Sequence, residues 1–191
     1  LAWRGSEQMG IGARATKTHV MIATWDWPSY FSPELLEKGI SLTISQWRKP
    51  SPETAPVQSK AAGLYIINTL SKHTAEEAGF DDALMCDWRG NPVEATGANL
   101  FIAKNGVLRT PKADCFLNGI TRLTVIDLAR ELNIPFEEMT ITMDDLNAAD
   151  EVFLTGTAAE ITPVGRIDNA RYTVGAVTKK LRDAYAVLVR R

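Results

Sequence analysis

The dipeptide Asn105-Gly106 is the feature of this sequence that most restricts the fold. It separates two short apolar runs, residues 100–103 and 107–109. Asn-Gly readily adopts the left-handed backbone of a two-residue turn, whose twist matches that of antiparallel strands. The pattern therefore predicts a β-hairpin, and the fold must contain antiparallel strands.

Strands and helices are mixed along the rest of the chain, without strict strand-helix-strand alternation. We expect further strands at residues 19–25, 40–47 and 151–155, and on both sides of the loop 87–91. We expect helices at residues 59–78, 121–132 and 174–188, helix-closing glycines at Gly39 and Gly79, and proline-rich irregular segments at residues 27–33 and 50–56. This mixture predicts one domain over residues 1–191 with an α+β fold, in which outer helices pack on a curved mixed sheet, a pseudo-barrel.

Charge and composition exclude several classes of function. The formal net charge is −2 and both signs are mixed along the chain, which leaves no basic surface for nucleic acid or an anionic membrane. The longest apolar runs are too short to span a bilayer. Cys86 and Cys115 lack the pattern of a disulfide framework, and His19 and His73 have no metal ligand at the usual spacing. We therefore expect reduced thiols, no bound metal and a cytoplasmic location.

Two segments have the composition of anion-binding sites. Gly119 precedes an amphipathic helix, whose first turn leaves backbone amides without partners and carries partial positive charge. Residues 155–159 are all small, so their amides can approach a ligand closely and the hydroxyl of Thr157 can add a hydrogen bond. From local sequence alone, an ordinary helix start and a tight turn are the commoner explanations.

Two charged residues lie among small neighbours. Glu94 is followed by Ala-Thr-Gly-Ala, so it has few local partners and is available for a ligand. Lys60 is followed by Ala-Ala-Gly at the start of a predicted helix. A lysine that projects into a cavity and loses its water becomes a nucleophile able to form a Schiff base. For each residue alone, an exposed and solvated side chain is the alternative.

The order and spacing of these segments are more informative than any one of them. The four blocks are Lys-Ala-Ala-Gly-Leu-Tyr at 60–65, Glu-Ala-Thr-Gly-Ala-Asn-Leu-Phe at 94–101, Leu-Asn-Gly-Ile-Thr-Arg at 117–122 and Gly-Thr-Ala-Ala-Glu-Ile-Thr-Pro at 156–163. From about Met9 to the final helix, the chain resembles the fold-type IV pyridoxal-phosphate enzymes, and among them the branched-chain amino-acid aminotransferases. The resemblance implies the cofactor-binding large domain, with the fold of that domain in D-amino-acid aminotransferase-like enzymes.

The resemblance implies pyridoxal 5′-phosphate as the cofactor and assigns roles around it. Lys60 would bind the cofactor covalently and later move a proton between the substrate Cα and the cofactor. Glu94 would pair with the pyridine nitrogen and keep the ring protonated, and the phenol of Tyr65 would hydrogen-bond the ring oxygen. The other cofactor contacts implied are Leu117 on the ring face, Gly119, and, at the phosphate, Ile120, Thr121 and Thr157.

The resemblance also implies a substrate and the residues that bind it. The amides of Thr157 and Ala158 match the positions that bind the substrate carboxylate. Met9-Gly10-Ile11 matches a loop that reaches into the neighbouring subunit's pocket, and Trp27 matches an aromatic wall of that pocket; plain core packing is the alternative for these residues. The implied reaction transfers the amino group between L-leucine, L-isoleucine or L-valine and 2-oxoglutarate, in a homodimer or a higher homo-oligomer.

The sequence departs from the family in two respects. Family members begin with a small N-terminal domain, which this chain lacks, and Asn118 stands where another residue is more common. D-amino-acid aminotransferases and aminodeoxychorismate lyases share the cofactor blocks and are the enzymatic alternatives. A cofactor-free scaffold that only forms dimers is the alternative of another class.

Overall fold

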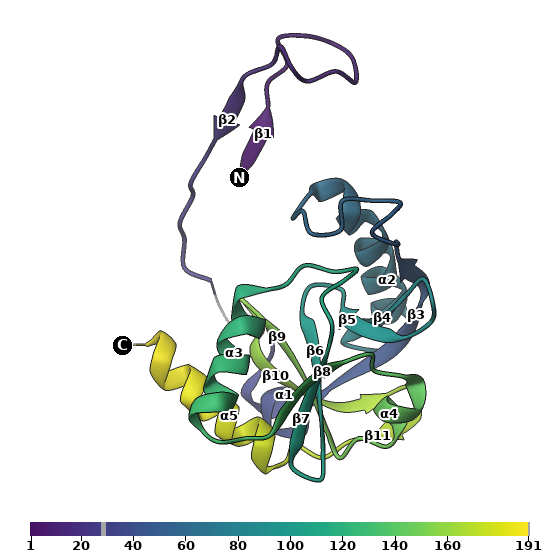
Figure 1. The fold of residues 1–191 in the computed structure, drawn as a ribbon, viewed down its shortest axis with the longest axis vertical. Helices are drawn as coiled ribbons and strands as arrows, with labels where there is room; N and C mark the ends of the chain where they lie inside the picture. The colour runs from purple at the N-terminus through teal and green to yellow at the C-terminus, as the bar shows by residue number, and fades with distance from the viewer. Residues whose placement is uncertain (28–29, 191) are drawn as a thin grey trace.

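The computed structural model describes residues 1–27 and 30–190, which form a body and a hairpin that projects from it (Figure 1). In this N-terminal hairpin, β1 (Ala2–Arg4) pairs antiparallel with β2 (Thr18–Val20), and both strands are exposed throughout. The strand expected at residues 19–25 is wrong beyond Val20, because the partner strand begins at Ala2 and the pairing ends there. Pro28 and Ser29 of the expected irregular segment lie outside the described residues.

The body is built on a sheet that closes into a ring. The strands of the ring are β3 (Ile40–Lys49), β4 (Asp82–Asp87), β5 (Pro92–Ala95), β6 (Asn99–Lys104), β9 (Glu151–Gly156) and β10 (Glu160–Ile167). β3 is parallel to β4 and β10, the other neighbours are antiparallel, and β9 closes the ring by pairing with both β6 and β10. The expected curved mixed sheet is therefore confirmed.

Three short strands extend the ring at its edges. They are β7 (Val107–Pro111), β8 (Phe136–Met139) and β11 (Ala170–Arg171). β6 and β7 form the predicted hairpin, and its turn residues Asn105 and Gly106 have φ values of +50° and +77°. Both values lie in the left-handed region that this type of turn requires, which explains the Asn-Gly pair.

Alternate residues of the ring strands point to opposite faces. Leu100, Ile102 and Leu154 belong to the apolar cluster in the interior of the ring. Phe101 and Phe153 lie between them in sequence and pack on the outside, with stacked rings whose centroids are 5.1 Å apart. Because apolar side chains fill the interior, polar groups that bind a ligand have to lie at an end of the ring.

Helices cover the outside of the ring on two sides. α2 (Ile66–Glu77) follows the short 3₁₀ helix η1 (Ala62–Tyr65) and packs on β3 and β4, whereas α3 (Ile120–Glu131) and α5 (Ala176–Val189) pack together over β9 and β10 (Figure 1). α1 (Pro33–Lys38) and α4 (Met143–Asn147) are short. Among the residues described, no helix is long and apolar enough to cross a membrane.

Candidate active site

A cavity of about 340 Å³ opens at one end of the ring. Its walls come from the ends of β3, β5 and β9, the segment between β3 and α2, and the segment before α3. A cavity of this size is in the usual range for small-molecule sites. The residues that line it include all eight for which the resemblance implies a cofactor contact: Lys60, Tyr65, Glu94, Leu117, Gly119, Ile120, Thr121 and Thr157.

Glu94, on β5, is a buried carboxylate with a contact on each oxygen. Its Oε1 lies 2.8 Å from Nζ of Lys49, and the two side chains are 10% and 9% exposed. Its Oε2 accepts a longer hydrogen bond from Nδ2 of Asn99, at 3.5 Å. Burial raises the pKa of Glu94, and the ammonium group of Lys49 opposes this rise. The charge of the carboxylate therefore depends on one neighbouring lysine.

Asn99, the first residue of β6, connects this carboxylate with the start of α3. Its Nδ2 also donates to the carbonyl oxygen of Leu117, at 3.0 Å. Its Oδ1 lies so close to Gly119 that a Cβ added there would be 2.4 Å from it. Only glycine lets the two segments approach this closely, so Gly119 is required for contact rather than for an unusual backbone angle.

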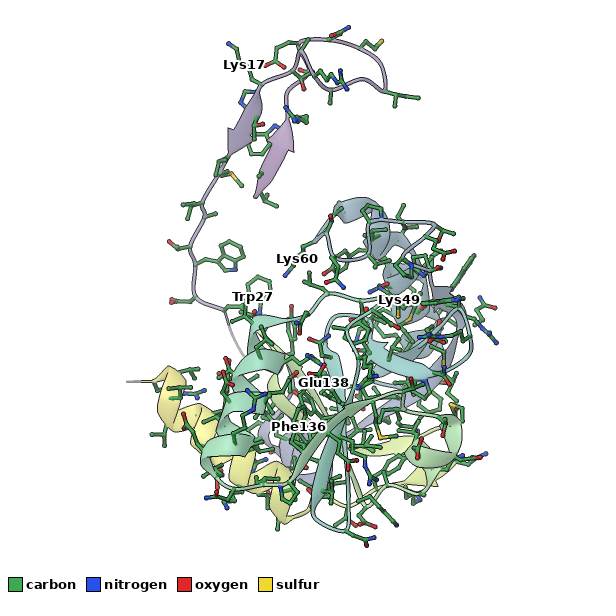
Figure 2. All side chains as sticks on the ribbon, viewed as in Figure 1. Lys17, Trp27, Lys49, Lys60, Phe136 and Glu138 are labelled. Atoms are coloured by element: carbon green, nitrogen blue, oxygen red, sulfur yellow. The ribbon has the colours of Figure 1, made fainter. Side chains whose placement is uncertain are left out.

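Lys60 lies in the coil before η1, and its side chain is exposed (Figure 2). The helix expected to begin at residue 59 begins later, because Ser59 closes a tight turn by donating to the carbonyl of Pro56. The loss of water that we expected for this lysine is not found. Within the described residues no hydrogen bond or ion pair engages its amine, in contrast to Lys49 on the same cavity.

Polar groups at the start of α3 and the end of β9 face the same space. α3 begins after Gly119, which has no side chain to cap the amides of the first turn. The Thr155 hydroxyl on β9 is buried and lacks a hydrogen-bond partner in the part of the chain that the structure describes. A buried polar atom without a partner destabilises the fold unless a ligand or water bonds to it. Both features indicate a polar or anionic ligand.

Two other titratable groups line the cavity in their neutral forms. Burial raises the pKa of Tyr65, and the nearby charge of Glu94 raises it further, so the phenol keeps its proton and can donate a hydrogen bond. Burial likewise raises the pKa of Cys115. Cys86 and Cys115 are both free and buried, which agrees with the reduced thiols predicted.

The residues predicted to bind substrate lie in two different places. Thr157 lines the cavity, and Ala158 follows it in the turn after β9. Met9-Gly10-Ile11 lies in the loop of the N-terminal hairpin, away from the body, with Met9 and Ile11 fully exposed. Trp27 is on the connecting segment, is 54% exposed and is not among the residues that line the cavity (Figure 2). The roles of the hairpin loop and Trp27 stay predictions.

Comparison with known proteins identifies the family. A family model described as amino-transferase class IV matches residues 1–167. The chain belongs to this family. Among its relatives, the branched-chain-amino-acid aminotransferase of Pseudomonas aeruginosa is 40% identical over 192 residues, which are 99% of this chain and 62% of the relative. The chain thus spans about 62% of the length of that protein.

Solved aminotransferases share the fold closely. The branched-chain aminotransferase of Thermoproteus uzoniensis with norvaline has a TM-score of 0.93 at 37% identity, over 98% of this chain and 62% of that one. The branched-chain amino acid aminotransferase of T.th. with pyridoxamine 5′-phosphate has a TM-score of 0.93 at 38% identity, over 100% and 64%. Other structures of the T.th. enzyme contain N-(5′-phosphopyridoxyl)-L-glutamate or 4-methylvaleric acid.

Four polar residues of this class IV aminotransferase cavity were missed from the sequence: Lys49, Asn68, Asn99 and Thr155. Asn68 accepts a hydrogen bond from Nζ of Lys49 at 3.3 Å and donates to the carbonyl of Thr96 at 2.6 Å. It thereby connects α2 with β3 and with the turn after Glu94. An asparagine on the buried stripe of an amphipathic helix was the available signal, because a buried amide needs partners.

Proposed function

We propose that this chain is the cofactor-binding large domain of a pyridoxal-5′-phosphate-dependent aminotransferase. Its reaction transfers the amino group between branched-chain L-amino acids and 2-oxoglutarate. The cavity carries this proposal, because segments far apart in sequence bring together a free lysine, a buried carboxylate and the uncapped start of a helix. The norvaline, 4-methylvaleric acid and phosphopyridoxyl-glutamate bound to the related enzymes support the two substrate classes.

The residues of the cavity fit this cofactor. The first-turn amides of α3 suit a phosphate, since they carry partial positive charge and Gly119 leaves them uncapped. The unpartnered hydroxyl of Thr155 lacks the hydrogen bond that a polar ligand supplies. The buried carboxylate of Glu94 suits a protonated ring nitrogen, because a charge out of water needs an opposite charge beside it.

The chain's own residues then have distinct tasks. When bound, the cofactor supplies a carbonyl that takes up an amine and a ring that withdraws electrons from the substrate Cα. Lys60 would hold the cofactor covalently through Nζ and, once displaced, move a proton at the substrate Cα. Glu94 would hold the proton of the ring nitrogen. Tyr65 keeps its phenolic proton and would donate it in a hydrogen bond to the ring oxygen.

The remaining residues would orient the ligands. Leu117 would pack on the ring, and the phosphate would be bound at Gly119, Ile120, Thr121 and Thr157. The amides of Thr157 and Ala158 would bind the substrate carboxylate. We further propose that Met9-Gly10-Ile11 of a second subunit and Trp27 contact the substrate side chain, which requires a homodimer or a larger oligomer. A cytoplasmic location belongs to the same proposal.

A half-reaction tests the function. The full-length protein, loaded with pyridoxal 5′-phosphate, is mixed with L-isoleucine while absorbance spectra are recorded. We expect the aldehyde form of the cofactor to convert to its amine form, and 2-oxoglutarate to reverse the change. Conversion by D-alanine or elimination from aminodeoxychorismate instead would indicate the two related enzymes. A full-length protein that binds no cofactor would support the non-catalytic scaffold.

The role of Lys60 is tested separately by chemical trapping. Borohydride reduction fixes the lysine-bound cofactor, and peptide mass spectrometry then locates it. We expect the label on Lys60, its loss in Lys60→Ala, and an unchanged label in the matched variant Lys104→Ala, which removes a surface lysine paired with Asp150. A label on Lys49, the other lysine of the cavity, would refute the assignment.

A further inference from the structure

Two lysines line the cavity, and the proposed function uses only one of them. Lys49 ends β3 with its amine buried, whereas Lys60 lies on the exposed loop before η1 (Figure 2). Burying an ammonium group is strongly unfavourable unless a counter-charge and further hydrogen bonds compensate. Lys49 has both, because Nζ lies 2.8 Å from Oε1 of Glu94 and 3.3 Å from Oδ1 of Asn68.

The contacts around Glu94 fix the direction of its carboxylate. Lys49 binds Oε1 from the β3 side, and Asn99 donates to Oε2 from the first residue of β6. Asn68 holds the lysine in turn and is itself tied to the backbone of Thr96, two residues after Glu94. Because one cation and two carboxamides restrain it, the carboxylate is oriented before any ligand arrives.

We propose that Lys49 is a positioning residue that keeps Glu94 ionised and oriented toward the cavity, ready for the protonated ring nitrogen of the cofactor. This inference rests on the proposed function, since it concerns the same site. It assigns Lys49 no contact with substrate and no part in proton transfer. Its effect passes through the carboxylate alone.

The proposal makes a signed prediction for ligand binding. A ring nitrogen that carries a proton binds an ionised Glu94, so affinity falls at acid pH where the free carboxyl takes up a proton. An ammonium group at hydrogen-bond distance lowers a carboxyl pKa by roughly 1–3 units. Removing the charge of Lys49 should therefore move this acid fall in affinity upward by roughly 1–3 pH units, toward neutrality.

Other groups at the site do not produce the same change. Tyr65 from η1 and Cys115 from the segment before α3 interact with the charge of Glu94, and burial raises the pKa of each, so both stay neutral in the acid range. Lys60 lines the same cavity and is present in every protein compared. Any protonation of the ligand's phosphate is common to both ligands used below.

The experiment measures binding of pyridoxamine 5′-phosphate to the full-length protein, freed of cofactor, by calorimetry between pH 4.5 and 8. This ligand has an amine in place of the aldehyde, so it binds without a covalent link to Lys60. The matched ligand is the analogue in which a C–H group replaces the ring nitrogen. Lys49→Gln keeps a hydrogen-bond donor but loses the charge, Lys49→Arg keeps the charge, and Lys104→Gln is the surface control.

We expect Lys49→Gln to move the acid fall for pyridoxamine 5′-phosphate upward, and Lys49→Arg and Lys104→Gln to leave it in place. The shift should be absent with the C–H analogue and in the Glu94→Gln background. If Lys49→Gln does not fold, Lys49→Met serves as the second uncharged variant. An unshifted profile in a folded uncharged variant, or equal shifts for both ligands, would overturn the role of Lys49 alone. A wild-type protein that binds neither ligand would overturn the proposed function as well.

Discussion

Replacing Gly119 by alanine should disturb the site through a single contact. The added Cβ would lie 2.4 Å from Oδ1 of Asn99, far inside van der Waals distance. The backbone itself accepts alanine, since Gly119 has φ −65° and ψ 145°. The clash therefore displaces the Asn99 side chain, whose Nδ2 donates to the carbonyl of Leu117 at 3.0 Å.

The size of the effect follows from these contacts. Leaving a buried amide without its hydrogen bond costs about 1–3 kcal/mol. Alanine is also a poorer N-cap residue than glycine, which adds about 1 kcal/mol. The free energy of unfolding should thus fall by roughly 2–4 kcal/mol, and a chain of this size loses about 2–4 °C in Tm for each kcal/mol. Affinity for pyridoxamine 5′-phosphate should fall with it, because the start of α3 is displaced.

Thermal unfolding and calorimetry on four proteins test this reasoning. The matched control is Gly63→Ala, since a Cβ at Gly63 would meet no atom within 4 Å. In the Asn99→Ala background the clash is absent, so Gly119→Ala should retain only the smaller helix-capping loss of about 1 kcal/mol. An equal loss in both backgrounds, or a Gly119→Ala protein as stable as Gly63→Ala, would refute the steric explanation.

Three other substitutions have defined outcomes. Glu151→Gln should lower the free energy of unfolding by about 1.5–3 kcal/mol, because the buried carboxylate accepts hydrogen bonds at the start of α5; chemical denaturation measures this. Thr155→Val should leave Tm unchanged or higher, since its hydroxyl has no partner, but lower the affinity for pyridoxamine 5′-phosphate by roughly 2- to 10-fold. Burial opposes the charge of Asp87, yet hydrogen bonds from Asn91 and Arg89 hold its pKa below the ordinary value. A lowered pKa in the folded state stabilises above the unfolded pKa of about 3.9, so the wild type should lose this stability as pH falls through and below that value. Asp87→Asn should show a smaller loss over the same range, as pH-dependent denaturation will show.

Much of the fold could be predicted because its signals are local. The Asn105-Gly106 turn and the apolar stripe of α3 each depend on a few adjacent residues, and the structure has both. α4 was not predicted, although Thr142 and Asp145 form the reciprocal cap that marks a helix start. Its five residues are too few to show an apolar period.

The cavity was harder to predict where its residues depend on distant pairing. The alternation expected in β3 ends with a register shift between Ile44 and Arg48, and this irregularity turns Lys49 inward. No pattern within the strand shows such a shift, because the partner strand determines it. Lys60 was expected to be desolvated, but its neighbours in sequence could not indicate what covers the mouth of the cavity.

The arrangement of the ring separates the residues that stabilise the fold from those that bind ligand. Along β9, Leu154 packs in the apolar interior, and Thr155, the next residue, presents an unpartnered hydroxyl to the cavity. Along β5, the side chains of Glu94 and Ala95 alternate in the same way between the cavity and the interior. Because side chains alternate at every strand end, a ring with a filled interior can place polar groups from several strands around one cavity. The polar residues can therefore vary for binding while their apolar neighbours continue to hold the sheet closed.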